Sequence, residues 1–159
     1  MNTKTLHIER TFDAPVEKVW EAWTNPEEVK KWWGPKGWTA PVIKMDLQEG
    51  GTFLGCMRGA MEPGGPERDT WSGGVYKEII PMQKIVSSDY FTDSEGNKID
   101  PKEAGMPGEW PDEMRVTVAF EDLGDKTKLT LTHEGHPAEI ADMAEAGWNE
   151  SLDKLAAIL

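Results

Sequence analysis

The amino-acid sequence predicts an α+β fold, in which a curved antiparallel sheet of about six strands wraps around one long C-terminal helix. Short segments of alternating apolar and polar residues follow one another with hairpin-sized connections, which is typical of antiparallel sheets. Each segment has one apolar face, so the sheet covers its core on one side. A continuous apolar stripe at helical spacing runs from about Pro137 to the last residue, Leu159. A helix of that length crosses a small domain.

Two short helices are expected directly after the first strand. Residues 5–12 carry apolar side chains at alternating positions, which indicates the strand. Pro15 then suits the first turn of a helix. Apolar side chains follow it at helical spacing: Val16, Val19, Trp20 and Trp23. Asn25 can cap a second helix with Pro26 at its first position, and Gly34-Pro35 ends that helix.

The remaining strands are expected in two groups, separated by an irregular segment. The predicted strands cover residues 43–47, 52–60, 70–80, 84–92, 114–120 and 129–133. Residues 93–112 contain three prolines and three glycines and have no apolar period. A stretch of about 20 residues without regular structure is unusual in a compact domain and tends to be functional or mobile. We expect a single domain over residues 1–159.

Composition excludes several classes of protein. The chain has 17 basic and 29 acidic residues, a net charge of −12, which argues against a general nucleic-acid binder. No run approaches the ~18 apolar residues of a membrane-spanning helix, so no membrane partner is expected. The single cysteine and an N-terminus without the apolar core of a signal peptide predict a cytoplasmic protein.

Several motifs resemble the START-like, or helix-grip, superfamily, also called SRPBCC or birch-pollen-allergen-like. The branch related to the activator of the heat-shock protein 90 ATPase is the closer match. The similar segments are residues 10–15, 19–27, 32–35, 50–51, 74–81, 127–132 and 147–148. The resemblance implies a deep pocket between sheet and helix. Its members include lipid carriers, cyclases and co-chaperone domains, so the family alone does not set the function.

The expected pocket lies between the sheet and the C-terminal helix, because one helix does not fill a curved sheet completely. His133 shares an apolar face with Leu129 and Leu131, and it is either a polar anchor in the pocket or a hydrogen-bonded core histidine. Gly147 lies inside the helix at a cost of ~1 kcal/mol, so something there needs space, either a ligand or a closely packed strand. The predicted lining residues are Trp33, Met57, Trp71, Val75, Met114, Val116, His133, Met143 and Trp148.

Metal and catalytic sites have little support in the sequence. His133 and His136 are three residues apart and would need a helix to converge on a metal, whereas Gly135 lies where a strand ends. Cys56 has only Arg58 as a basic neighbour and more closely matches a small buried hydrophobe. We expect no metal, no cofactor and no catalytic residue.

The sequence therefore favours non-catalytic binding or sequestration of a small hydrophobic or aromatic molecule. One alternative, implied by the resemblance, is a co-chaperone-like interaction domain with a chaperone as partner. A second alternative is a cyclase- or hydrolase-type enzyme that uses the same pocket, with His133 and a carboxylate as its acid–base pair. The chain is expected to be a monomer or a homodimer.

Three apolar side chains of the irregular segment, Ile99, Met106 and Trp110, have no place in a purely solvated loop. We predict that they dock onto the mouth of the pocket and that the loop acts as a lid. In the alternative, Trp110 packs against the neighbouring strand and the loop is static.

Overall fold

The computed structural model describes residues 2–60, 62–106 and 108–159. Its strands are β1 (Thr3–Phe12), β2 (Thr39–Met45), β3 (Thr52–Ala60), β4 (Glu67–Ile80), β5 (Lys84–Phe91), β6 (Met114–Asp122) and β7 (Thr127–Pro137). Its helices are α1 (Val16–Thr24), α2 (Pro26–Val29), the 3-10 turn η1 (Ala138–Ile140) and α3 (Ala141–Ile158). Within the described ranges, no helix combines the length and the apolar character needed to cross a bilayer.

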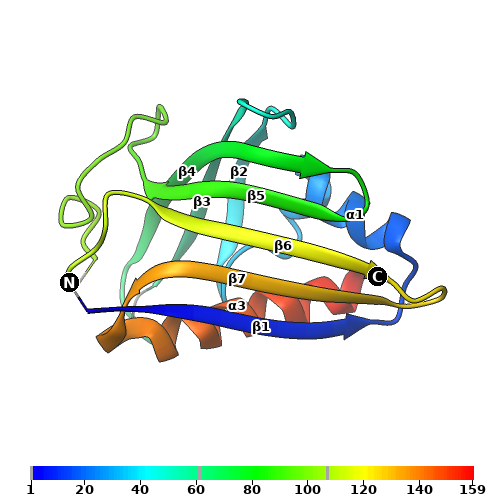
Figure 1. Cartoon of the computed structure of the whole chain (residues 1–159). Helices are drawn as coiled ribbons and strands as arrows, with labels where there is room; N and C mark the ends of the chain where they lie inside the picture. Colours follow the sequence, from blue (N-terminus) through cyan, green and yellow to red (C-terminus); the bar gives the residue numbers. More distant parts are fainter. Residues whose placement is uncertain (1, 61, 107) are drawn as a thin grey trace.

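The strands form one antiparallel sheet in the order β1-β7-β6-β5-β4-β3-β2. Strands β2 to β7 therefore follow as a meander, and β1 joins the sheet beside the last strand. The sheet is curved, and α3 lies on its inner side along β1 and β7 (Figure 1). The predicted α+β fold is confirmed, with a sheet of seven strands.

The core lies between the inner face of the sheet, α1 and α3. Leu152 and Leu155 of α3 are fully buried in the same cluster as Leu129 and Leu131 of β7. The α1 stripe also packs as predicted: the Trp20 ring lies edge-on to Phe120, with 5.2 Å between the ring centroids. These contacts hold both helices against one face of the sheet.

Trp32 fixes the short connection after α2. Its indole is fully buried, and its Nε1–H donates to the carbonyl oxygen of Ala22 at 2.9 Å. The neighbouring Trp33 is only half-buried. One of these two adjacent indoles is therefore committed to the core, and the other is left at its boundary.

The C-terminal helix begins later than its sequence pattern indicates. Pro137 still belongs to β7, because it pairs with Thr3 of β1 and keeps an extended conformation. The turn η1 then reorients the chain before α3 begins at Ala141. The pairing of β7 with β1 thus keeps residues up to Pro137 in the sheet, although their apolar spacing fits a helix.

Residues 93–112 contain no helix or strand among the described positions, as predicted. Local bonds order the beginning of the segment, where the Asp93 carboxylate accepts from the backbone N–H groups of Glu95 and Asn97. Further along, the Arg68 guanidinium of β4 donates to the carbonyl oxygen of Ala104. The loop is therefore anchored to the sheet.

Leu152 supplies a test of how the helix stabilises the fold. We expect Leu152→Ala to lower the free energy of unfolding by about 2–5 kcal/mol, because it removes a fully buried side chain from the core. Leu123→Ala is the matched control, since Leu123 is 51% exposed. Urea denaturation measures both values, and equal effects would contradict the packing of α3.

Candidate functional site

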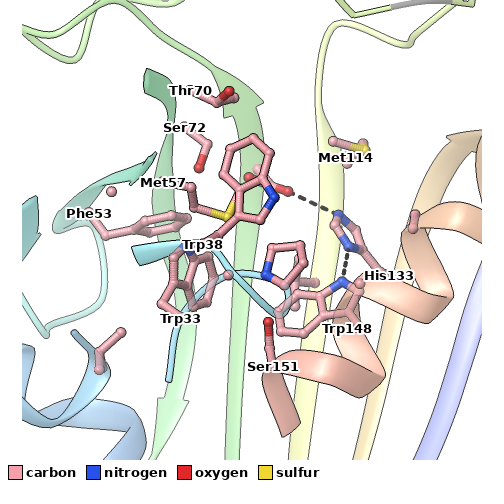
Figure 2. Close-up of a pocket in the computed structure, with 18 of the residues that line it drawn as sticks. Trp33, Trp38, Phe53, Met57, Thr70, Ser72, Met114, His133, Trp148 and Ser151 are labelled. Carbon is pink, nitrogen blue, oxygen red and sulfur yellow. Dashed lines mark hydrogen bonds and ion pairs between the residues drawn. The ribbon is translucent and has the colours of Figure 1, made fainter. Parts of the chain in front are cut away.

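A cavity of about 510 Å³ lies between the inner face of the sheet and the helices. Its walls are largely aromatic and sulfur-containing. Six tryptophans and five methionines line it: Trp23, Trp32, Trp33, Trp38, Trp110 and Trp148, with Met45, Met57, Met106, Met114 and Met143. Figure 2 shows Trp33, Trp38, Phe53 and Met57 across this space from His133 and Met114.

Seven of the nine predicted lining residues meet in this cavity: Trp33, Met57, Met114, Val116, His133, Met143 and Trp148. Met143 remains 67% exposed, which places it at the mouth. The structure thus brings together side chains from four strands or helices and from the turn after α2. Whether they bind a ligand stays a prediction.

The prediction that Trp71 and Val75 line the cavity is wrong, because neither residue is part of its wall. On β4 the cavity-facing side chains are Thr70, Ser72 and Tyr76, so the odd-numbered residues point to the other side of the sheet. The apolar character of Trp71 and Val75 suggested instead that the odd-numbered side chains face the cavity. On this part of β4 the small polar residues Thr70 and Ser72 face the cavity together with Tyr76, whereas Trp71 and Val75 do not.

The three predicted lid residues divide between two places. Met106 and Trp110 line the main cavity, whereas Ile99 lines a separate small hollow with Trp71. The Trp110 ring lies edge-on to Phe91 of β5, with 5.1 Å between centroids. Trp110 therefore packs against a neighbouring strand and also borders the cavity. Lid motion itself stays a prediction.

A chain of three side chains crosses the cavity from helix to sheet. The Trp148 Nε1–H of α3 donates to Nδ1 of His133 at 3.0 Å, and His133 Nε2 lies 2.9 Å from Oδ2 of Asp89 (Figure 2). An indole N–H only donates, so Nδ1 carries no proton and the imidazole proton is on Nε2. The Nε2–H is not aligned with the Asp89 oxygen, so this contact is electrostatic and not a full hydrogen bond. His133 is therefore a neutral imidazole.

A bulge in β7 brings a second histidine to the same place. Between Leu6 and Lys4, β1 advances two residues while β7 advances three, from His133 to His136. The extra residue puts both imidazoles on one face, with 4.1 Å between ring centroids. Gly135 takes a φ of +105°, which favours glycine. The expectation that these histidines converge only on a helix is wrong.

The histidine pair has no third metal ligand in a suitable place. In residues 2–60, 62–106 and 108–159, no group of three His, Cys, Asp or Glu side chains is arranged to hold a metal ion. Burial, with a smaller effect of His133, lowers the pKa of His136 to about 4, although Asp89 opposes the shift. His136 is thus neutral at pH 7.

Four buried ring nitrogens have no hydrogen-bond partner in the described part of the chain: Nε1 of Trp23 and Trp33, Nε2 of His133 and Nδ1 of His136. All four belong to residues that line the cavity. A buried polar group left unpaired costs about 1–3 kcal/mol, so such groups are rare in ordinary cores. These nitrogens therefore belong to the residues that form the cavity wall, but each atom is buried within the wall.

Some lining residues were missed by sequence reasoning. Ser87 and Asp89 of β5 face the cavity, although polar residues in a strand usually indicate the solvent face. Trp38 lies in a loop with no apolar period. Gly59 is the one sequence feature that points to the position of Trp38, because a Cβ at Gly59 would lie 2.3 Å from the Trp38 ring. A glycine in a strand often marks such a close approach.

Cys56 is fully buried, and burial is the main cause that raises the pKa of its thiol. Asp69 raises this pKa further, and Arg58 opposes the shift. A raised pKa keeps the thiol protonated and unreactive. Cys56 thus packs as the small hydrophobe that the sequence indicated.

His136 gives the site a measurable pH dependence. Between pH 6.5 and about 4 the unfolded chain binds a proton at this residue and the folded chain does not, so stability falls as the pH is lowered. Titration of His136 alone lowers the free energy of unfolding by up to about 3 kcal/mol over this range. Urea denaturation between pH 6.5 and about 4 should show that the free energy of unfolding falls less steeply in His136→Gln than in the unmodified protein. His7→Gln, at an exposed histidine, is the control and should leave the fall unchanged; equal slopes for all three proteins would contradict the assignment.

Comparisons with known proteins agree with this architecture. A protein from Chromobacterium violaceum is 28% identical, with a TM-score of 0.77 over 97% of this chain and 95% of that one. A protein from Arthrobacter aurescens is 26% identical, with a TM-score of 0.75 over 97% and 84%. The AHSA1 protein from Silicibacter pomeroyi, at 24% identity and a TM-score of 0.72 over 97% and 96%, shares the fold.

No curated protein matches the chain. The model of one family, described as "Activator of Hsp90 ATPase homolog 1-like protein", matches residues 13–159. The match covers both α1 and α3 and all strands except β1. The resemblance seen in the sequence is thereby confirmed, and the chain belongs to the family of Activator of Hsp90 ATPase homolog 1-like proteins.

Proposed function

We propose that this protein binds a small hydrophobic or aromatic molecule, without catalysis, in the cavity between sheet and α3. The observation that carries the proposal is a cavity of about 510 Å³ whose walls are largely aromatic and sulfur-containing. A hydrophobic molecule that covers these apolar walls removes their surface from water, and this burial favours binding.

The cavity suits a ligand of moderate size. Its volume of about 510 Å³ falls within the range of ~300–1,000 Å³ common for small-molecule pockets. Tryptophan rings offer large rigid surfaces, and the flexible methionines adapt to ligand shape.

The histidines support binding more than catalysis. The lone pair of His133 Nδ1 already accepts the Trp148 N–H, so this atom is not free to take a proton from a substrate. His136, with its pKa lowered to about 4, is a weak base at pH 7. Neither histidine is therefore a good general base, which disfavours the enzyme alternative with His133 as half of its acid–base pair.

The family description supports a second candidate, a surface that binds a chaperone. A co-chaperone-like domain acts through protein contacts and does not need the cavity. Pull-down with heat-shock protein 90, with stimulation of its ATPase as the readout, tests this candidate separately. Stimulation that persists when the cavity is filled would favour it over small-molecule binding.

Filling the cavity tests the proposed function. We expect a neutral aromatic dye, N-phenyl-1-naphthylamine, to quench tryptophan emission saturably at one site per chain. Gly147 lines the cavity, and a Cβ there meets only Pro35, at 3.4 Å, so Gly147→Leu fits the helix and extends into the space. The variant should remain folded and weaken dye binding at least about tenfold, because the dye and the new side chain compete for one volume.

Ala156→Leu is the matched control, since it adds a leucine to an exposed position of the same helix. It should leave the dye affinity unchanged. Dye binding that is equally strong in Gly147→Leu and in the unmodified protein would place the binding site elsewhere and refute the proposal.

The loop supplies a kinetic test. Replacing residues 95–109 with a short glycine-containing turn removes Met106 from the cavity wall. If the loop is a lid, the melting temperature stays nearly normal and the dye dissociates several-fold faster, because the mouth stays open. Stopped-flow displacement of the dye measures this rate. Lost stability with unchanged dissociation would instead identify a static structural loop.

A further inference from the structure

We propose that the ligand is a small organic cation, an apolar or aromatic body that carries a protonated amine, with the Asp89 carboxylate as its counter-ion. The inference rests on the proposed function and names the chemical class of the ligand. It comes from the charges that face the cavity and from the partners that each of them has.

Asp89 is placed in the cavity by the register of β5. It alternates with Ser87 and Phe91, which also line the cavity, so the three side chains share one face of the strand. The Asp89 side chain is only 18% exposed. It is therefore an acid in a largely apolar chamber and not part of a solvated surface.

The groups nearest to Asp89 do not neutralise it. Its closest partner, His133, is held in the neutral form because Nδ1 accepts the Trp148 N–H. His136 also stays neutral, because burial disfavours its charged form. In residues 2–60, 62–106 and 108–159, no lysine or arginine forms an ion pair with Asp89. The carboxylate thus has a dipolar neighbour but no counter-charge.

The other charged side chains that line the cavity do not supply one. Lys44 lies on the edge strand β2 with an exposed side chain, and Glu150 of α3 adds a second negative charge. Lys154 is close to Glu150 in the helix, but it donates to the carbonyl oxygens of Pro35 and Trp38. The lining as a whole therefore has an excess of negative charge.

This cavity favours a cationic ligand over a neutral or anionic one. A carboxylate removed from water without a counter-charge is costly, and a bound ammonium group offsets that cost. The indoles of Trp33, Trp38 and Trp148 surround the same space, and tryptophan faces attract cations (Figure 2). The net charge of −12 also favours the approach of cations over long range. An anion would meet Asp89 and Glu150 and be repelled.

Three probes with one ring system and different charges test the inference: 2-(1-naphthyl)ethylammonium, 2-(1-naphthyl)ethanol and 1-naphthylacetate. Isothermal titration calorimetry at pH 7 gives the affinity of each for the full chain. We expect the cation to bind at least about tenfold more tightly than the alcohol, and the anion to bind most weakly. Asp89→Asn, which keeps the shape of the side chain and removes its charge, should remove the preference for the cation while the alcohol binds as before.

Asp125→Asn is the control, because it changes the net charge by the same amount at an exposed turn position. It should keep the preference. Equal binding of cation and alcohol to the unmodified protein would overturn the inference and leave the proposed function standing, as would a preference that survives in Asp89→Asn. Failure of all three probes to bind would overturn both. The comparison of probes on the unmodified protein holds even if Asp89→Asn does not fold.

Discussion

The hydrogen bond from Trp148 to His133 determines the character of the whole site. Because an indole nitrogen can only donate, this bond fixes the proton of His133 on Nε2 and keeps the ring uncharged. That in turn presents an N–H, and not a cation, to Asp89. The same bond connects α3 with β7, so it links the helix to the strand that carries His133 and also fixes the protonation of that histidine.

The cavity persists because its walls are rigid rings that support one another. Trp148 stacks on Trp23, with 6.3 Å between centroids and 19° between planes, and meets Trp33 edge-on at 5.6 Å. Each indole is a large rigid ring system with no internal rotation, and mutual ring contacts hold these rings in place around the space. Gly147, beside Trp148, adds no side chain to the helix surface here. Large rings and a missing side chain together leave room that a well-packed core would fill.

Periodicity was sufficient to predict most of the fold. The α1 stripe and the apolar face of Leu129, Leu131 and His133 are regular over their full lengths, and both lie as expected. Prediction failed where the chain departs from a regular period. The extra residue in β7 turns His136 to the face of His133. In β4 the small polar residues Thr70 and Ser72 face the cavity, so hydrophobicity did not indicate which face of this strand points inward. Asp89 could not be found from the sequence, since one acid in a strand is usually a solvent-facing residue.

Membership of the family explains the sheet and the helix but not the ligand, because chemistry resides in a few side chains that the fold only positions. In this chain the decisive side chains come from three separate elements: Asp89 from β5, His133 from β7 and Trp148 from α3. Together they put an acid beside a neutral histidine inside an aromatic chamber. In the proposed site, replacing Asp89 alone by a neutral residue would remove the preference for a cation without changing the strand that carries it. The charge preference that we propose therefore follows from the pairing of charges within the site, which fold similarity alone does not reveal.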